Sequence, residues 1–163
     1  MITADTVTRT WERVGAMPPE QAPHLIEQMH KEQPVVLAYL MAMTEQPEFS
    51  PDDRETVFYI GVVVWQIMKQ SPHGLRRVSE RNLDEVIDAN DEQLEKFAAG
   101  SASLQHAVKA MLESHPEPEV LRYIVEALME EEEPGEPPVS AESLGLAFLT
   151  LKNILDALVL GRA

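Results

Sequence analysis

Residues 50–68 read SPDDRETVFYIGVVVWQIM, and this stretch decides the fold. Ser50 is a preferred helix cap, Pro51 suits the first helical position, and Asp52 and Asp53 lie where carboxylates favour the positive end of the helix dipole. The nine residues 57–65 are almost wholly apolar, far fewer than the roughly 20 that cross a bilayer as a helix. A helix that is apolar on every side is buried on every side. The stretch therefore predicts a central helix in a soluble domain.

A second helix of the same kind is predicted at the end of the chain. It begins at a Ser140 cap, ends near Leu160 and contains ten Leu, Ile, Phe or Val residues. Between these two helices and before them, apolar residues recur at spacings of three and four, which is typical of amphipathic helices. We expect six further helices, over residues 3–15, 20–32, 34–41, 83–100, 104–112 and 120–129. Residues 130–138 read EEEEPGEPP, whose charge and prolines predict a solvated loop.

The sequence aligns with itself over most of its length. At a separation of 83 positions the alignment pairs Trp11 with Leu94, Val14 with Phe97, Ala16 with Ala99, Leu25 with Val108 and Met29 with Leu112. At 84 it pairs Pro34 with Pro118, Leu37 with Leu121, Tyr39 with Tyr123 and Leu40 with Ile124, and at 90 it pairs Ser50 with Ser140, Phe58 with Phe148 and Trp65 with Leu155.

These pairs predict an all-α fold made by tandem duplication of a four-helix unit. The units span residues 1–75 and 79–163 and form one compact domain, either bundle-like or as a short α-solenoid. The alternative is that any two amphipathic helices align by apolar period alone.

Charge and composition exclude several partners. The chain carries 28 acidic and 13 basic residues, a formal charge of -15, and phosphate backbones avoid such a surface, so we expect no nucleic-acid partner. It has no cysteine, which excludes disulfides and thiolate metal sites. The first residues lack a signal pattern. We therefore expect a cytoplasmic protein without a membrane partner.

Two motifs resemble metal sites only in part. Glu27 and His30 have the Glu-x-x-His spacing of di-iron bundles, but the positions paired with them by the repeat, Ala110 and Glu113, do not supply the second motif. Residues 88–92 read DANDE, but a calcium loop needs a glycine where Gln93 stands. No phosphate loop or catalytic triad is evident. We expect no catalytic residues, metal or cofactor, although the sequence leaves enzymatic activity open.

A basic cluster interrupts the acidic background at the junction of the two units. It consists of Lys69, His73, Arg76, Arg77 and Arg81. Such a cluster is suited to bind an acidic peptide or a phosphate. The alternative is that these side chains neutralise the neighbouring acidic helix.

The last helix carries a second apolar stripe opposite the one that faces its own unit. This stripe contains Leu146, Leu149, Asn153 and Leu160. It predicts either a homodimer interface or burial against the other unit of the same chain.

Because no chemical motif is complete and helical units supply apolar grooves, the sequence favours a non-enzymatic protein–protein interaction or adaptor module. The alternative is a small helical-bundle protein that binds a metal or ligand, or an enzyme. A single polar pocket containing Glu27, His30 or several histidines would favour that alternative.

Overall fold

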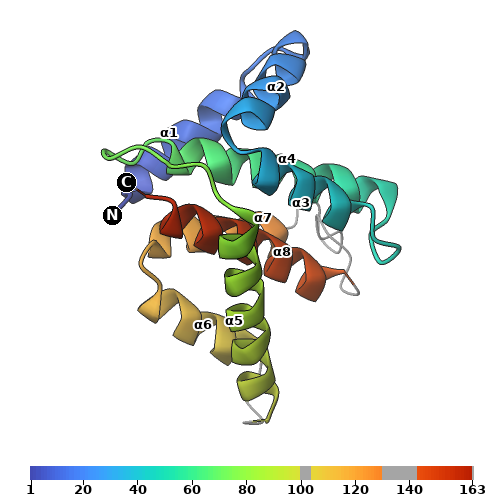
Figure 1. Cartoon of the computed structure of the whole chain (residues 1–163), viewed down its shortest axis with the longest axis vertical. Helices are drawn as coiled ribbons and strands as arrows, with labels where there is room; N and C mark the ends of the chain where they lie inside the picture. Colours follow the sequence, from blue (N-terminus) through green and yellow to red (C-terminus); the bar gives the residue numbers. More distant parts are fainter. Residues whose placement is uncertain (100–103, 130–142, 163) are drawn as a thin grey trace.

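A computed structural model describes residues 1–99, 104–129 and 143–162. This part of the chain is all-helical and contains eight α-helices and no strand (Figure 1). The helices are α1 (Ala4–Gly15), α2 (Ala22–Glu32), α3 (Pro34–Thr44), α4 (Pro51–Met68), α5 (Glu80–Ala99), α6 (Leu104–Ser114), α7 (Pro118–Met129) and α8 (Leu144–Leu160), with a 3-10 turn, η1 (Pro19–Gln21), before α2. The all-helical prediction is confirmed, and no helix within the described ranges is long and apolar enough to span a membrane.

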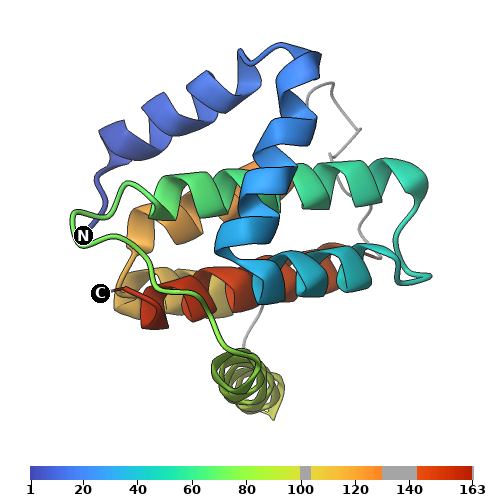
Figure 2. The ribbon, with the colours of Figure 1, turned by 45° about the horizontal axis from the view of Figure 1, so that its top comes forward.

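Helices α4 and α8 form the centre of the molecule. They pack against each other, and Figure 2 shows them side by side with the remaining helices around them. Every residue from 60 to 68 and from 150 to 155 is buried. Helix α4 also packs on α1, α3 and α7, while α8 packs on α5, α7 and α3. The two most apolar helices are thus buried as their composition predicts.

The first turns of these two central helices differ. Ser50 accepts a hydrogen bond from the amide of Asp53, whose carboxylate accepts one from the amide of Ser50, so the predicted cap of α4 is confirmed. Helix α8 begins at Leu144, and Ser140 lies outside the described residues. Ser143 precedes α8 and donates from Oγ to the carbonyl of Glu48 at 2.6 Å. This contact holds the start of α8 beside the start of α4.

Two buried polar residues precede the helix-starting prolines of α3 and α7. Gln33 accepts a hydrogen bond from the amide of Val78 at 2.9 Å. Glu117 accepts one from the amide of Ile2 at 2.8 Å and also pairs with Arg162. Gln33 thereby fixes the segment before α5, and Glu117 fixes the segment before α1. The contacts of Glu117 also explain why the two ends of the chain lie close together in Figure 1.

Candidate functional site

An apolar pocket opens between α1, η1, α2 and α4, and we call it the first groove. Its volume is about 590 Å³, within the roughly 300–1,000 Å³ of typical ligand pockets. Pro18 and Pro19 follow the end of α1 and prevent the helix from continuing. The chain turns there into α2, which projects from the body of the molecule (Figure 1). Because α2 packs mainly on α3, its side toward α1 and α4 is left open.

The walls of the first groove are formed by aliphatic and aromatic side chains. They include Val14, Met17, Leu25, Ile26, Phe58 and Tyr59. Leu25 and Ile26 are only half-buried, and Tyr59 is exposed, so apolar surface faces the opening. The charged residues that line this groove are Arg54 and Glu55. An arrangement of this kind fits an apolar binding partner.

A second apolar pocket, the second groove, lies between α5, α6, α7 and α8. Its volume is about 300 Å³, and no charged residue is among the described residues that line it. Six of its lining residues occupy positions that the self-alignment of the sequence pairs with lining residues of the first groove. These pairs are Leu25 with Val108, Thr44 with Leu128, Arg54 with Leu144, Glu55 with Gly145, Phe58 with Phe148 and Tyr59 with Leu149.

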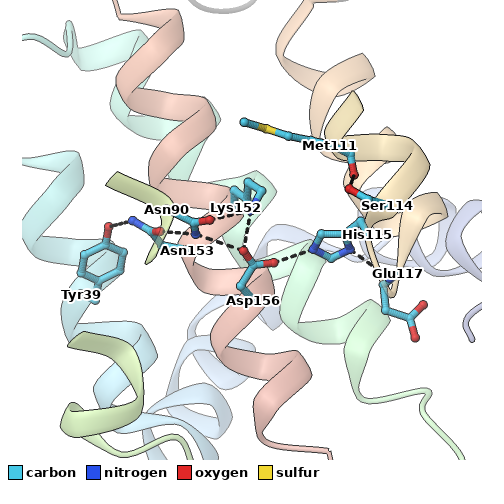
Figure 3. Close-up of polar contacts among 9 residues, drawn as sticks. All are labelled: Tyr39, Asn90, Met111, Ser114, His115, Glu117, Lys152, Asn153 and Asp156. Atoms are coloured by element: carbon cyan, nitrogen blue, oxygen red, sulfur yellow. Dashed lines mark hydrogen bonds and ion pairs between the residues drawn. The ribbon is translucent and has the colours of Figure 1, made fainter. Parts of the chain in front are cut away.

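A buried polar cluster connects α3, α5 and α8 with the turn between α6 and α7 (Figure 3). The Lys152 ammonium donates to Oδ1 of Asn90 at 2.6 Å and to the Asp156 carboxylate at 2.7 Å. Asn90 donates to Asn153 at 2.7 Å, and Asn153 donates to the hydroxyl of Tyr39 at 3.0 Å. The cluster therefore links one residue of α3, one of α5 and three of α8 by mutual hydrogen bonds.

His115 closes the other end of the polar cluster. Its Nδ1 accepts a hydrogen bond from the amide of Glu117 at 2.9 Å, and its Nε2 lies 2.5 Å from Asp156 Oδ1. Because Nδ1 accepts a bond, the ring proton that faces Asp156 resides on Nε2. His115 is thus a hydrogen-bond donor to Asp156, fixed in one tautomer by the backbone.

The surroundings shift two pKa values in the polar cluster. Burial raises the pKa of Asp156, but the hydrogen bond from His115 and the charge of Lys152 outweigh it and leave this pKa below its usual range. Burial raises the pKa of the Tyr39 hydroxyl, an effect that its hydrogen bond with Asn153 partly offsets. At neutral pH the cluster therefore holds an ionised Asp156 beside Lys152 and a neutral Tyr39.

The polar cluster lies beside a pocket of about 400 Å³, which Val86, Met111 and Val159 also line. The nearby Ser114 hydroxyl donates to the carbonyl of Ala110 at 3.0 Å, and His115 has both ring nitrogens engaged. The arrangement therefore does not activate Ser114 as a nucleophile, and its satisfied bonds suit the joining of helices. No set of three or more potential metal ligands occurs in the described part of the chain.

The residues of the predicted basic cluster have separate surroundings. Lys69 pairs with Glu32 at 3.2 Å and lies over the ring of Trp65. Arg77 donates to the carbonyl of Lys31 at 2.8 Å. Both line one pocket at the end of α2.

The other three members of the basic cluster do not line that pocket. Arg81 pairs with Glu85 within α5 at 3.3 Å, and His73 and Arg76 are exposed. The structure therefore brings together two of the five predicted residues.

The second stripe of α8 is also divided. Leu146 and Leu149 line the second groove, whereas Leu160 is 57% exposed at the other end of the helix. Asn153 is buried in the polar cluster. The amide of Asn153 is therefore bonded within the chain, which is the second of the two alternatives that the sequence left open for this residue. Dimerisation through the leucines stays a prediction.

The Glu-x-x-His motif of the sequence, Glu27 and His30, does not belong to the polar cluster. Glu27 and His30 are exposed on α2, where Glu27 pairs with Lys31 at 3.5 Å. The polar cluster contains His115 instead. A signal for it was present in Lys152, Asn153 and Asp156, three of the four polar residues in the apolar helix α8.

The described part of the chain is thus all-helical, and two apolar grooves open on it. No protein-family model, curated protein or solved structure matches the chain.

Proposed function

We propose that the protein is a non-enzymatic interaction module whose two grooves each bind the apolar face of a partner helix. The observation that carries this proposal is the presence of apolar grooves at repeat-paired positions in both halves of the chain. A helix that presents an apolar stripe fits such a groove by burying the stripe and leaving its polar face in water.

The proposal includes a tandem duplication of a four-helix unit in a bundle-like core. Matching helix contacts support it: α4 packs on α1 and α3 as α8 packs on α5 and α7, and α2 packs on α3 as α6 packs on α7. Gln33 and Glu117, which are 84 positions apart, each hold the segment before the first helix of the other unit. An experimental structure in which residues 3–68 superpose on 86–158 is the expected result, and a different helix order in the two halves would contradict it.

The charge of the chain favours a basic partner helix. The formal charge is -15, and the first groove contains one acidic and one basic lining residue, so its local charge is balanced. Long-range attraction by the acidic surface therefore increases the association rate of basic segments and disfavours acidic ones. The partner we propose is an amphipathic helix with an apolar face and a polar face rich in Lys or Arg.

Fluorescence anisotropy with a designed peptide tests the proposal. The labelled peptide has leucines on one helical face and lysines on the other, and its controls are a scrambled peptide of the same composition and a peptide with Glu in place of Lys. We expect saturable binding of the amphipathic basic peptide, weakened by salt, and much weaker binding of both controls. Equal binding of the scrambled peptide would contradict the proposal.

Three exposed residues provide matched variants. Tyr59 of the first groove, Met129 of the second groove and Met41 of α3, which lines neither groove, are 44%, 41% and 49% exposed. We expect Tyr59→Arg and Met129→Arg each to weaken their own groove about tenfold, because each loses an apolar contact worth roughly 1.5 kcal/mol and repels the peptide. Met41→Arg is expected to leave both grooves unchanged. The same loss in all three variants would show that only overall charge matters.

A further inference from the structure

A donor-rich pocket lies between the end of α2, the end of α4 and the segment that follows α4. Its volume is about 400 Å³, and Glu32, Trp65, Lys69, Leu75 and Arg77 are among its lining residues. Gly74 of this pocket has a φ of 70°, a left-handed conformation that glycine adopts without strain. Lys69, which follows α4, and Arg77, which follows the turn at Gly74, line the same cavity.

Among the described residues, neither basic side chain finds partners for all of its donors. Lys69 gives one hydrogen bond, to Glu32 at 3.2 Å, and an ammonium group has three donors. Arg77 gives one hydrogen bond, from Nη2 to the carbonyl of Lys31 at 2.8 Å, and a guanidinium group has five. The guanidinium fork matches the oxygens of carboxylates and phosphates. Glu32 is the single acidic residue among the described residues of the lining, and Lys69 already neutralises it.

Trp65 adds an independent observation. It is fully buried, and its indole Nε1 has no hydrogen-bond acceptor among the residues that the structure describes. A buried donor without an acceptor costs roughly 1–3 kcal/mol, so such groups need an explanation in a folded protein. Lys69 lies over the same ring, with Nζ 4.8 Å from its centroid.

We propose that this pocket binds a small molecule through a phosphate or carboxylate group, with Lys69, Arg77 and the Trp65 indole as its donors. The three groups supply hydrogen bonds and no competing free acceptor, which is the requirement for an oxyanion. Leu75, which is half-buried, supplies apolar surface for the body of the ligand. The site is independent of the two apolar grooves, because its lining shares no residue with theirs.

NMR of the ¹⁵N-labelled full chain tests the site directly. The chain has two tryptophans, of which Trp65 lines the pocket and Trp11 is exposed elsewhere, so one indole signal reports and the other is the control. The probes are inorganic phosphate, phenyl phosphate and benzoate at low salt, with benzyl alcohol as an uncharged control. We expect a saturable downfield shift of the Trp65 indole proton with at least one anion, and no comparable shift of Trp11.

The set of anions that bind identifies the anionic group of the ligand. Binding of phosphate and phenyl phosphate without benzoate assigns a phosphate site, and binding of benzoate alone assigns a carboxylate site. Equal, unsaturable shifts of both indoles, or a response to benzyl alcohol equal to that of the anions, would overturn the proposal.

Arg77→Gln and Arg81→Gln form the matched pair of variants. Both remove one arginine charge from neighbouring positions, but Arg81 pairs with Glu85 and does not line the pocket. We expect Arg77→Gln to weaken anion binding at least tenfold while Arg81→Gln leaves it within about twofold, because direct donors act over short range. Equal effects of the two substitutions would show general charge attraction and refute a built site. Unchanged backbone amide spectra in both variants check that the fold is retained.

Discussion

At the scale of single residues, the polar cluster around Asp156 contains a buried ion pair. Lys152 and Asp156 are largely withdrawn from water, and such a pair is tolerated when the remaining hydrogen bonds are made. Asn90 and His115 make those bonds to Asp156. Loss of one partner therefore leaves a buried charge without compensation.

We expect Asp156→Asn to lower the free energy of unfolding at pH 7 by about 3 kcal/mol, since Lys152 remains buried without its counter-charge. The pKa of Asp156 is lower in the folded chain than in the unfolded chain. Its stabilisation is thus complete above the ordinary carboxyl pKa and is lost as the pH falls through the lower folded value. Denaturant unfolding between pH 2 and 7 should show a flatter acid limb in the variant.

Asp5→Asn is the control for that substitution. Asp5 forms an exposed pair with Arg9, and exposed pairs contribute little to stability. A loss of stability and of pH dependence as large as that of Asp156→Asn would contradict the account of the buried pair.

At the scale of elements, α4 depends on a close approach by α3. A Cβ atom at Gly61 would lie 2.7 Å from a methyl carbon of Leu40, which is fully buried. A Cβ atom at Gly145 of α8 would meet no other atom within 4 Å. The two helices therefore contain one glycine that packing requires and one that it does not.

We expect Gly61→Ala to destabilise the protein by about 1–2 kcal/mol, because overpacking exceeds the gain in helix propensity. Gly145→Ala should leave stability unchanged or raise it by about 0.5 kcal/mol. Thermal unfolding measures both. Similar effects at the two sites would mean that the approach of α3 to α4 is not tight.

The sequence predicted contacts correctly where both residues belong to the same helix. Ser50 and Asp53 act within one helical turn, so the cap of α4 followed from their spacing. The sequence left two places open for Asn153, because its partners, Tyr39 and Asn90, belong to distant helices whose register the sequence does not reveal. For the same reason the basic cluster indicated Lys69 and Arg77 but not Trp65, whose position over the pocket depends on packing.

At the scale of the whole molecule, the sequence predicts that Leu149 and Leu160 of α8 would carry the contact if two copies associate. Leu149 is half-buried in the second groove, and Leu160 is exposed. If the second groove binds another copy, Leu149→Lys should convert a dimer into a folded monomer in sedimentation experiments. If the unsubstituted protein sediments as a monomer, the predicted dimer is contradicted. The second groove would then be available to a different partner.

The methionine methyl groups report on both grooves and on a surface outside them. Met17 lines the first groove, Met129 lines the second groove, and Met41 is exposed on α3 outside both. Titration of the methyl-labelled protein with the amphipathic basic peptide is the most direct test of the proposed function. We predict saturable shifts of Met17 and Met129 with little change at Met41. Shifts of Met41 as large as those of Met17 and Met129, or no shift at either groove methionine, would contradict the claim that these grooves bind a partner helix.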